Sequence, residues 1–525
     1  MLTFPSILQR TARNFGPSIA IRTVDGSLSW KAFIERIARA ANVLKTLGVR
    51  PGDRFAILTL NNATSAELMH AGYWIGAIPI PLNYRLAAPE IALILEDADC
   101  RLLAIEQGFV HHLDRPPLAR WQSRALAIAP GRTTAPLPSY DILVGAARAI
   151  EPNEPGEDDD ALILYTGTPG GRGKGVRLSH RNIVASAMQL AHVMAIGPAD
   201  IYLHTAPMFR ASALKATAIT MHGGGHLYLN DFSAPNVLRT IERHRATIVP
   251  MVRPTLVQVL DDPDFVHYNL SSIRLITYSS SQMGPELINR TMNAFQGVDI
   301  HQCYGLIETA SAVAVLDERD HQRALVGDDP ILRSVGRPLA GVDLRIVDDT
   351  GREVPLNTAG EIVVRGPQIA RAYHHSGDDA ALRDGWFHTG DIGHLDAAGY
   401  VFLDDHKNDV INMGADLVHC AEVEAVLRDC DGVQEAAVFG IPDTVFGEVP
   451  VAFIVLVPGA TLNEADVIRH CRRQIGRYKI PRQIVFADRL LKSASGAVSK
   501  TELMHRFAAR LASAAEAARR GEILP

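Results

Sequence analysis

Leu162 to Val176 contain the groups with the clearest chemistry in this chain: LILYTGTPGGRGKGV. A short apolar run precedes a loop of Gly and Thr that ends near Lys174. Because Gly has no side chain to block an approach, backbone N–H groups and hydroxyls in such a loop can close around a phosphate. Lys174 would add a point charge. The stretch predicts a nucleotide-binding site, and a flexible surface loop is the alternative if the segment is taken alone.

The loop differs from the Walker pattern, in which G-x-x-x-x-G-K is followed by a Ser or Thr whose hydroxyl holds Mg²⁺. Thr168 stands where the first Gly of that pattern would be, and Gly175 follows Lys174. The sequence therefore indicates a phosphate-binding loop of another type.

Four later stretches carry isolated functional groups. CYGLIETA contains Glu308, and RDGWFHTGDIGHLDAAGY contains Asp391. Taken singly, Glu308 fits a solvated helix start and Asp391 fits a turn cap. The other two stretches are DDHKNDVINMGADLVHCAEVE, which starts at residue 404, and LLKSASGAVSKTEL, which starts at residue 490.

Composition limits the class of protein. A chain of 525 residues is too long for one core, and 47% hydrophobic with 21% charged residues fits a soluble globular protein of two to four domains. The net charge of −6 gives no support for nucleic-acid binding. We expect no membrane span and no signal peptide. Five scattered Cys without a CxxC pair indicate reduced thiols in the cytoplasm and argue against a zinc site.

Strand and helix patterns alternate along most of the chain, which predicts an α/β fold with mainly parallel sheets. Residues 115–160 are rich in Pro and predict a connection over the surface. After Gly336, short alternating strands predict a small antiparallel unit, and the tail predicts a small α+β domain. The predicted domains are 1–403 and 404–525. The predicted helices cover 29–47 and 65–75, and the predicted strands cover 54–60, 77–81, 101–105, 161–165, 201–205, 246–250, 275–278, 343–347, 360–364 and 400–403.

The order and spacing of these stretches resemble the acyl-adenylate-forming superfamily. GDRFAILTLNN, GAIPIPLNYRLAAPEIALIL, SVGRPLAGVDLRIVD, GEIVVRGP and DGWFHTGDIG resemble its AMP-forming acyl-CoA synthetase branch. The resemblance implies a large N-terminal domain, a small mobile C-terminal domain and a hinge near residues 405–408. It also implies ATP, Mg²⁺ and CoA as cofactors and a small carboxylic acid as substrate, and it leaves a homodimer open.

The implied reaction has two steps: a carboxylate attacks the α-phosphate of ATP to give acyl-AMP, and CoA thiolate then displaces AMP. Fixed cations and dipoles would neutralise the growing phosphate charge. By resemblance, the following roles are expected: Thr166, Thr168, Gly171 and Lys174 at the ATP phosphates; Tyr304 stacked on adenine; Glu308 on Mg²⁺; Asp391 on the ribose hydroxyls; Ser279, Ser280 and Ser281 beside adenine and the acyl pocket; His406 at the nucleotide; Arg210 and Gly305 in the substrate pocket.

Several positions depart from the family pattern. The loop reads YTGTPGGRGKGV where the family reads like YTSGTTGxPKGV, and Ile307 replaces a Thr. Arg210 replaces a His, His406 replaces an Arg, and Ala497 replaces the Lys of T-x-x-G-K.

The departures leave two hypotheses open: a working acid–thiol ligase with a divergent site, or a weakened relative that binds acyl-AMP, acyl-CoA or a partner without efficient adenylation. Arg210 either binds a second anionic group of the acid or points to solvent and pairs with an Asp.

Overall fold

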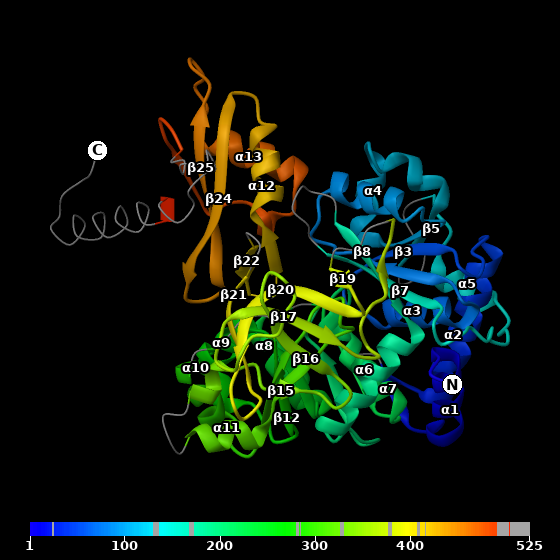
Figure 1. Ribbon diagram of the computed structural model, residues 1–525. Helices are drawn as coiled ribbons and strands as arrows, with labels where there is room; N and C mark the ends of the chain where they lie inside the picture. Colours follow the sequence, from blue (N-terminus) through cyan, green and yellow to red (C-terminus); the bar gives the residue numbers. More distant parts are fainter. Residues whose placement is uncertain are drawn as a thin grey trace. The chain divides into compact units, whose positions relative to one another are not determined.

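The computed structural model describes the 525-residue chain except for residues 24–25, 130–135, 167–172, 231, 280–282, 284, 326–329, 376–380, 407–409, 415, 491–502 and 505–525. The chain forms two compact units. The first comprises residues 1–84, 91–166 and 173–407, and the second comprises residues 85–90, 167–172 and 408–525. Figure 1 shows the elements of each unit.

The first unit is built on a nine-stranded sheet with the order β15-β14-β13-β12-β11-β9-β10-β1-β2. The run from β13 to β1 is parallel, whereas β2, β14 and β15 are antiparallel to their neighbours. Its strands are β1 (Ile19–Thr23), β2 (Gly26–Ser29), β9 (Ile201–His204), β10 (Gly225–Tyr228), β11 (Ile248–Met251), β12 (Leu275–Tyr278), β13 (Asp299–Tyr304), β14 (Ala314–Leu316) and β15 (Arg337–Pro338).

Three smaller sheets complete this unit. A parallel sheet has the order β4-β3-β5-β6 and contains β3 (Arg54–Leu58), β4 (Ile78–Pro81), β5 (Leu102–Glu106) and β6 (Ala125–Ile128). An antiparallel sheet has the order β18-β8-β7 and contains β7 (Asp160–Thr166), β8 (Lys174–Ser179) and β18 (Ala372–Tyr373). The small antiparallel unit contains β16 (Asp343–Val347), β17 (Gly360–Arg365), β19 (Leu382–Arg383), β20 (Trp386–Leu395) and β21 (Val401–His406).

Helices cover both faces of the nine-stranded sheet. On one face, α8 (Ala234–His244), α9 (Arg253–Asp261) and α10 (Pro285–Ala294) share an apolar cluster with β9, β11 and β12. On the other face, α6 (His180–Val193) and α7 (Ala216–Met221) pack against the same sheet. The remaining helices of the unit are α1 (Phe4–Phe15), α2 (Trp30–Thr46), α3 (Ala63–Ile75), α4 (Ala88–Asp97), α5 (Tyr140–Ala146) and α11 (Glu318–Leu325).

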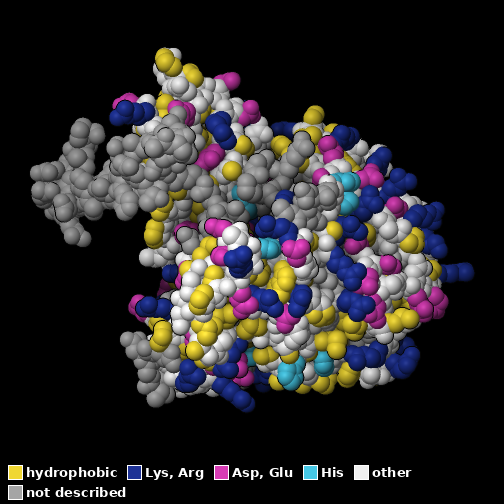
Figure 2. Space-filling model, in the orientation of Figure 1, with side chains coloured by type: hydrophobic (Ala, Val, Ile, Leu, Met, Phe, Trp, Pro, Cys, Tyr) yellow, Lys and Arg dark blue, Asp and Glu magenta, His cyan; other side chains and the backbone are white. Residues whose placement is uncertain are grey.

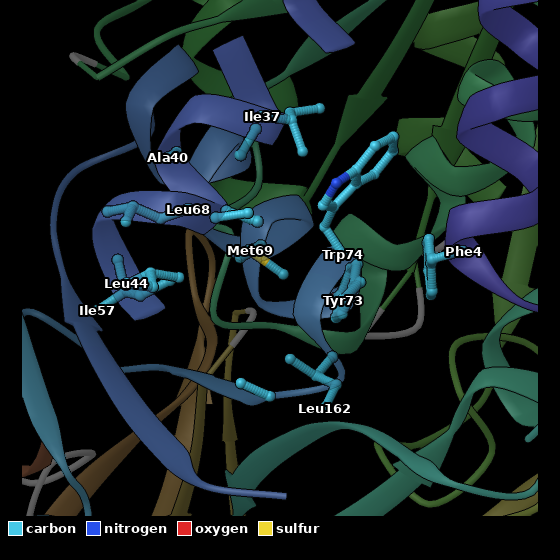
Figure 3. Packing of buried hydrophobic residues seen from close by; sticks show 14 of the residues in the cluster. Phe4, Ile37, Ala40, Leu44, Ile57, Leu68, Met69, Tyr73, Trp74 and Leu162 are labelled. Atoms are coloured by element: carbon cyan, nitrogen blue, oxygen red, sulfur yellow. The ribbon is translucent and has the colours of Figure 1, made fainter. Parts of the chain in front are cut away.

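Helices α2 and α3 show why these segments fold as they do. The Ser29 hydroxyl accepts from Ala32 N (3.2 Å) at the start of α2, and Asn62 accepts from Ser65 N (2.8 Å) at the start of α3. Such caps satisfy N–H groups that have no partner within the helix. The apolar residues of α2 recur at helical spacing and bury one face, whereas α3 is buried nearly all round. Figure 3 shows Leu44 of α2 and Leu68 of α3 in the same apolar cluster. Full burial of one such Leu contributes about 1.5–3 kcal/mol, more than any helix propensity difference between ordinary residues.

The second unit has one sheet with the order β23-β22-β25-β24, and β26 pairs with β25. Helices α12 and α13 contribute to its apolar core. Its elements are β22 (Val410–Met413), β23 (Asp416–His419), α12 (Cys420–Arg428), β24 (Val433–Asp443), β25 (Gly447–Leu456), α13 (Glu464–Gln474) and β26 (Gln483–Phe486). The predicted α/β class, the parallel-rich sheet and the small antiparallel unit are therefore confirmed.

Two predictions about local structure were wrong. Residues 115–160 contain more than a surface connection, because Ala125–Ile128 forms the buried strand β6 at the edge of the parallel sheet. The strand at 161–165 exists, but β7 pairs antiparallel with β8 and joins no parallel sheet. The boundary at 403/404 stays a prediction.

Surface features agree with the composition. In the view of Figure 2, Lys and Arg side chains are interspersed with Asp and Glu. All five Cys are free and buried. Among the described residues, no helix is long and apolar enough to cross a membrane.

Buried neutral histidines predict acid sensitivity. Burial lowers the pKa of His70, His180 and His301 to about 4 and that of His226 to about 3. Below pH 6.5 the unfolded chain therefore binds more protons than the folded chain, so the free energy of unfolding should stay level above pH 6.5 and fall toward pH 4. Each such histidine contributes about 1.4 kcal/mol per pH unit in that window.

Urea unfolding at several pH values measures this slope. His226→Gln should make the slope shallower by about one proton. A slope equal to that of wild type would contradict the prediction.

Candidate active site

A cation and a carboxylate are brought together at the β18-β8-β7 sheet. Thr166 ends β7 and is the register partner of Lys174, which begins β8. The ammonium of Lys174 lies 4.9 Å from the ring centroid of Tyr373, and the hydroxyl of Tyr373 donates to Glu308 Oε1 (2.9 Å). Lys174 and Glu308 are thus connected through one aromatic side chain.

The hairpin between β7 and β8 depends on a close approach of the backbone. A Cβ at Gly173 would lie 2.6 Å from the carbonyl oxygen of Thr166, so a larger residue would push the start of β8 away. Glycine at this position keeps Lys174 opposite Thr166. Thr168 and Gly171, also predicted at the phosphates, lie outside the described residues.

Glu308 is held by its backbone as well as by its side chain. Its carbonyl accepts from Ala370 N (2.7 Å), two residues before β18 begins. Burial raises the pKa of Glu308, Asp391 adds to this effect, and Tyr373 and Lys174 oppose it. A carboxylate with a raised pKa gains most when a cation comes close to it.

A second carboxylate of the site is tied to an aromatic residue. Tyr304, at the end of β13, donates its hydroxyl to Asp391 Oδ2 (2.6 Å), and both residues are buried. Desolvation and the charge of Asp391 raise the pKa of Tyr304, so the phenol stays protonated and keeps donating.

Asp391 is also fixed through β20 and its neighbour. Its N–H donates to the Thr389 hydroxyl (3.1 Å), which donates to the Ile362 carbonyl (2.8 Å). The backbone of His406 is its register partner on β21. His406 therefore lies next to Asp391 along the sheet.

Gly305 has a structural explanation of its own. A Cβ there would lie 1.9 Å from the carbonyl oxygen of Ser311, so only glycine allows the two backbones to approach. Its place in a substrate pocket stays a prediction.

The remaining predicted residues lie on other elements of the fold. Arg210 is half-buried and precedes η3 (Ala211–Lys215), and its guanidinium lies 5.7 Å from the Phe209 ring centroid. Ser279 follows β12 and is half-buried. Ser280 and Ser281 lie outside the described residues.

The chain matches known enzymes along most of its length. Residues 8–374 match the AMP-binding enzyme family, and residues 422–497 match the AMP-binding enzyme C-terminal domain. The chain belongs to the AMP-binding enzyme family.

Individual members of this family are similar over nearly their full length. The chain is 33% identical to a feruloyl-CoA synthase of Amycolatopsis sp, over 95% of this chain and 98% of that protein. The structure of the amide bond synthetase McbA from Marinactinospora thermotolerans has a TM-score of 0.86 at 27% identity, covering 95% of this chain and 99% of McbA. The o-succinylbenzoate CoA synthetase MenE from Bacillus subtilis has a TM-score of 0.84 at 27% identity, covering 95% and 98%.

Tyr373 was missed by the sequence reasoning. It lies in ARAYHH, and its two-residue strand is too short to show a periodicity. Its role is visible only in the pairing of β18 with β8.

We predict that Tyr373→Phe lowers the turnover of acid-dependent pyrophosphate release roughly 5–10-fold, because Glu308 loses a donor worth about 1 kcal/mol. The ring remains beneath Lys174, so unfolding should change little. Tyr268→Phe is the matched control, since the Tyr268 hydroxyl has no hydrogen-bond partner in the described part of the chain. Equal turnover in wild type and Tyr373→Phe would show that the bond to Glu308 is unimportant.

Proposed function

We propose that the protein activates a carboxylic acid as acyl-AMP and transfers the acyl group to CoA. The observation that carries this proposal is the cluster of Lys174, Glu308, Tyr304 and Asp391 in a chain of this family. The alternative, a relative without efficient adenylation, is not favoured, because the similar feruloyl-CoA synthase matches along 95% of this chain.

In the first step, a carboxylate oxygen forms a bond to the α-phosphorus of ATP and the bond to the pyrophosphate oxygen breaks. Lys174 and the β7–β8 loop, including Thr166, Thr168 and Gly171, supply positive charge and donors for the phosphates. Preorganised groups of this kind are each worth about 10²–10³ in rate. In the second step, the CoA thiolate bonds to the acyl carbon and AMP leaves.

The nucleoside of ATP would lie at Tyr304 and Asp391. Two carboxylate oxygens suit two ribose hydroxyls. Because the Tyr304 hydroxyl already donates to Asp391 Oδ2, the aromatic ring and the carboxylate form one preoriented pair. Ser279, Ser280 and Ser281 would lie beside the adenine, and His406 would extend the site along β21.

Magnesium would reach the site with ATP. Among the described residues, no group of three or more His, Cys, Asp or Glu forms a metal site. Mg²⁺ is usually bound by one or two carboxylates together with substrate phosphates, and the single carboxylate of Glu308 fits that pattern. When bound, the ion would neutralise phosphate charge.

The acid, the assembly and the compartment are further parts of the proposal. Arg210 and Gly305 would border the acid. Five free buried cysteines support a reducing compartment, which we propose to be the cytoplasm. A homodimer is proposed as the assembly.

The test is pyrophosphate release with a panel of carboxylic acids, followed by thioester formation with CoA. Release should require both ATP and an acid, and Lys174→Met should lower it roughly 10²–10³-fold. The exposed Lys31→Met is the control for loss of one positive charge. Tight binding of ATP without release from any acid would reject the ligase and support the weakened relative.

The position of Ala497 gives a gain-of-function prediction. The family pattern has a Lys there, and residue 497 lies outside the described residues. Ala497→Lys should raise the rate of pyrophosphate release at least about 10-fold if the rest of the site is competent, because one cation aimed at the reacting phosphate is restored. Lysine at the neighbouring Ser495 is the positional control. An unchanged rate of pyrophosphate release in Ala497→Lys would indicate that the altered phosphate loop limits the reaction.

A further inference from the structure

A buried lysine lies at the start of α7, which packs against the nine-stranded sheet. Lys215 ends η3, directly before α7, and is 3% exposed. Among the described residues it has no ion pair and no hydrogen-bond partner for its ammonium group. A buried charge without a counter-charge is costly, so lysine is rarely fully buried unless it is paired.

Three uncharged polar groups in this part of the fold lack partners. Within the described part of the chain, the buried His301 Nδ1, Thr277 Oγ1 and Tyr202 hydroxyl have no hydrogen-bond partner, and His301 is close enough to Lys215 to feel its charge. Thr277 and His301 are register partners on β12 and β13, so their side chains leave the sheet on the same side. Unpaired buried polar groups are few in native proteins, and each one requires an explanation.

Contacts with α7 show which face of the nine-stranded sheet carries the His301 and Thr277 side chains. Ala216 and Ile219 of α7 share an apolar cluster with Tyr202 and Cys303. Cys303 is two residues after His301, and residues two apart lie on one face of a strand. Tyr202, His301 and Lys215 therefore belong to the same buried layer between the sheet and α7.

The charges in this layer favour an anion. Burial lowers the pKa of His301 to about 4, Asp317 opposes this effect, and His321, Arg274 and Lys215 add to it. The imidazole is therefore neutral at pH 7 and can donate one hydrogen bond. Asp317 forms no ion pair with Lys215, so the ammonium charge is not neutralised by the nearby carboxylate.

We propose that Lys215, with His301, Thr277 and Tyr202, binds a second anionic group on the acid substrate, such as a distal carboxylate. This inference rests on the proposed function and specifies its substrate class. His301 lies on β13, the strand that ends at Tyr304.

The experiment compares suberate with octanoate, which has the same chain length and lacks the second carboxylate. Wild type should show a kcat/KM for pyrophosphate release roughly 10–100-fold higher with suberate, the range expected for a charge-assisted hydrogen bond. Lys215→Met should abolish the preference and change the octanoate rate less than about threefold. The exposed Lys45→Met should keep the preference.

A second measurement is independent of turnover. Suberate should raise the melting temperature of wild type more than octanoate does, and Lys215→Met should lose that difference. If Lys215→Met does not fold, Lys215→Arg should keep the preference for suberate and His301→Gln should reduce it.

The outcomes separate the two proposals. Release with octanoate as good as with suberate, or an unchanged preference in Lys215→Met, overturns the distal-anion site and leaves the ligase intact. No release with any acid overturns the ligase itself. A rise in melting temperature with suberate would then still support the anion site.

Discussion

The site depends on one piece of backbone pairing, the antiparallel contacts of β8 with both β7 and β18. Pairing with β7 places Lys174 opposite Thr166, and pairing with β18 places Tyr373 beside Val176. Residue 373 is far in sequence from residues 166 and 174, yet the hydrogen-bond ladder holds all three within one sheet. A shift of one residue in this register would turn every side chain to the opposite face. Lys174 would then leave the ring of Tyr373.

Burial and neighbouring hydroxyl groups determine the electrostatic environment of the two carboxylates of the site. Burial raises the pKa of Glu308 by removing water from the carboxylate. The hydrogen bond from the Tyr373 hydroxyl and the charge of Lys174 lower that pKa again. Asp391 has the Tyr304 hydroxyl as its donor. Glu308 forms no ion pair within 4 Å among the described residues, so its carboxylate remains available to groups that a nucleotide would bring. That is the arrangement expected of a site that binds a polyanion together with its counter-ion.

The sequence predicted those strands whose pattern lies within one short segment, and it failed where the strand depends on distant neighbours. The β12 and β16 strands match their predicted ranges, because short apolar or alternating runs are visible in single segments. The buried β6 was missed because the Pro-rich segments around it suggested a loop, whereas ALAI is buried by its neighbour β5. The antiparallel direction of β7 could not be read from LILYT, because an apolar run has the same appearance in either direction.

The candidate site likewise contains residues that a sequence motif identifies and residues that only the fold identifies. Lys174, Glu308, Tyr304 and Asp391 were selected from motif order, and the structure brings them into two linked pairs. Tyr373 and Lys215 carry no motif. Their importance comes from long-range neighbours, a carboxylate on another loop in one case and a strand beneath α7 in the other.

Lys215 and Lys479 of the second unit are both buried, but they differ in whether a carboxylate neutralises the charge. Lys479 is as buried as Lys215, but it has Glu90 at 2.7 Å and Glu422 at 2.6 Å. Those carboxylates raise its pKa and explain the charge structurally. Lys215 lacks any such partner among the described residues. An unpaired buried charge costs stability, and replacing it with an apolar side chain would be neutral or stabilising in many proteins. A lysine in this position is therefore better explained by a ligand that completes the pair than by the fold.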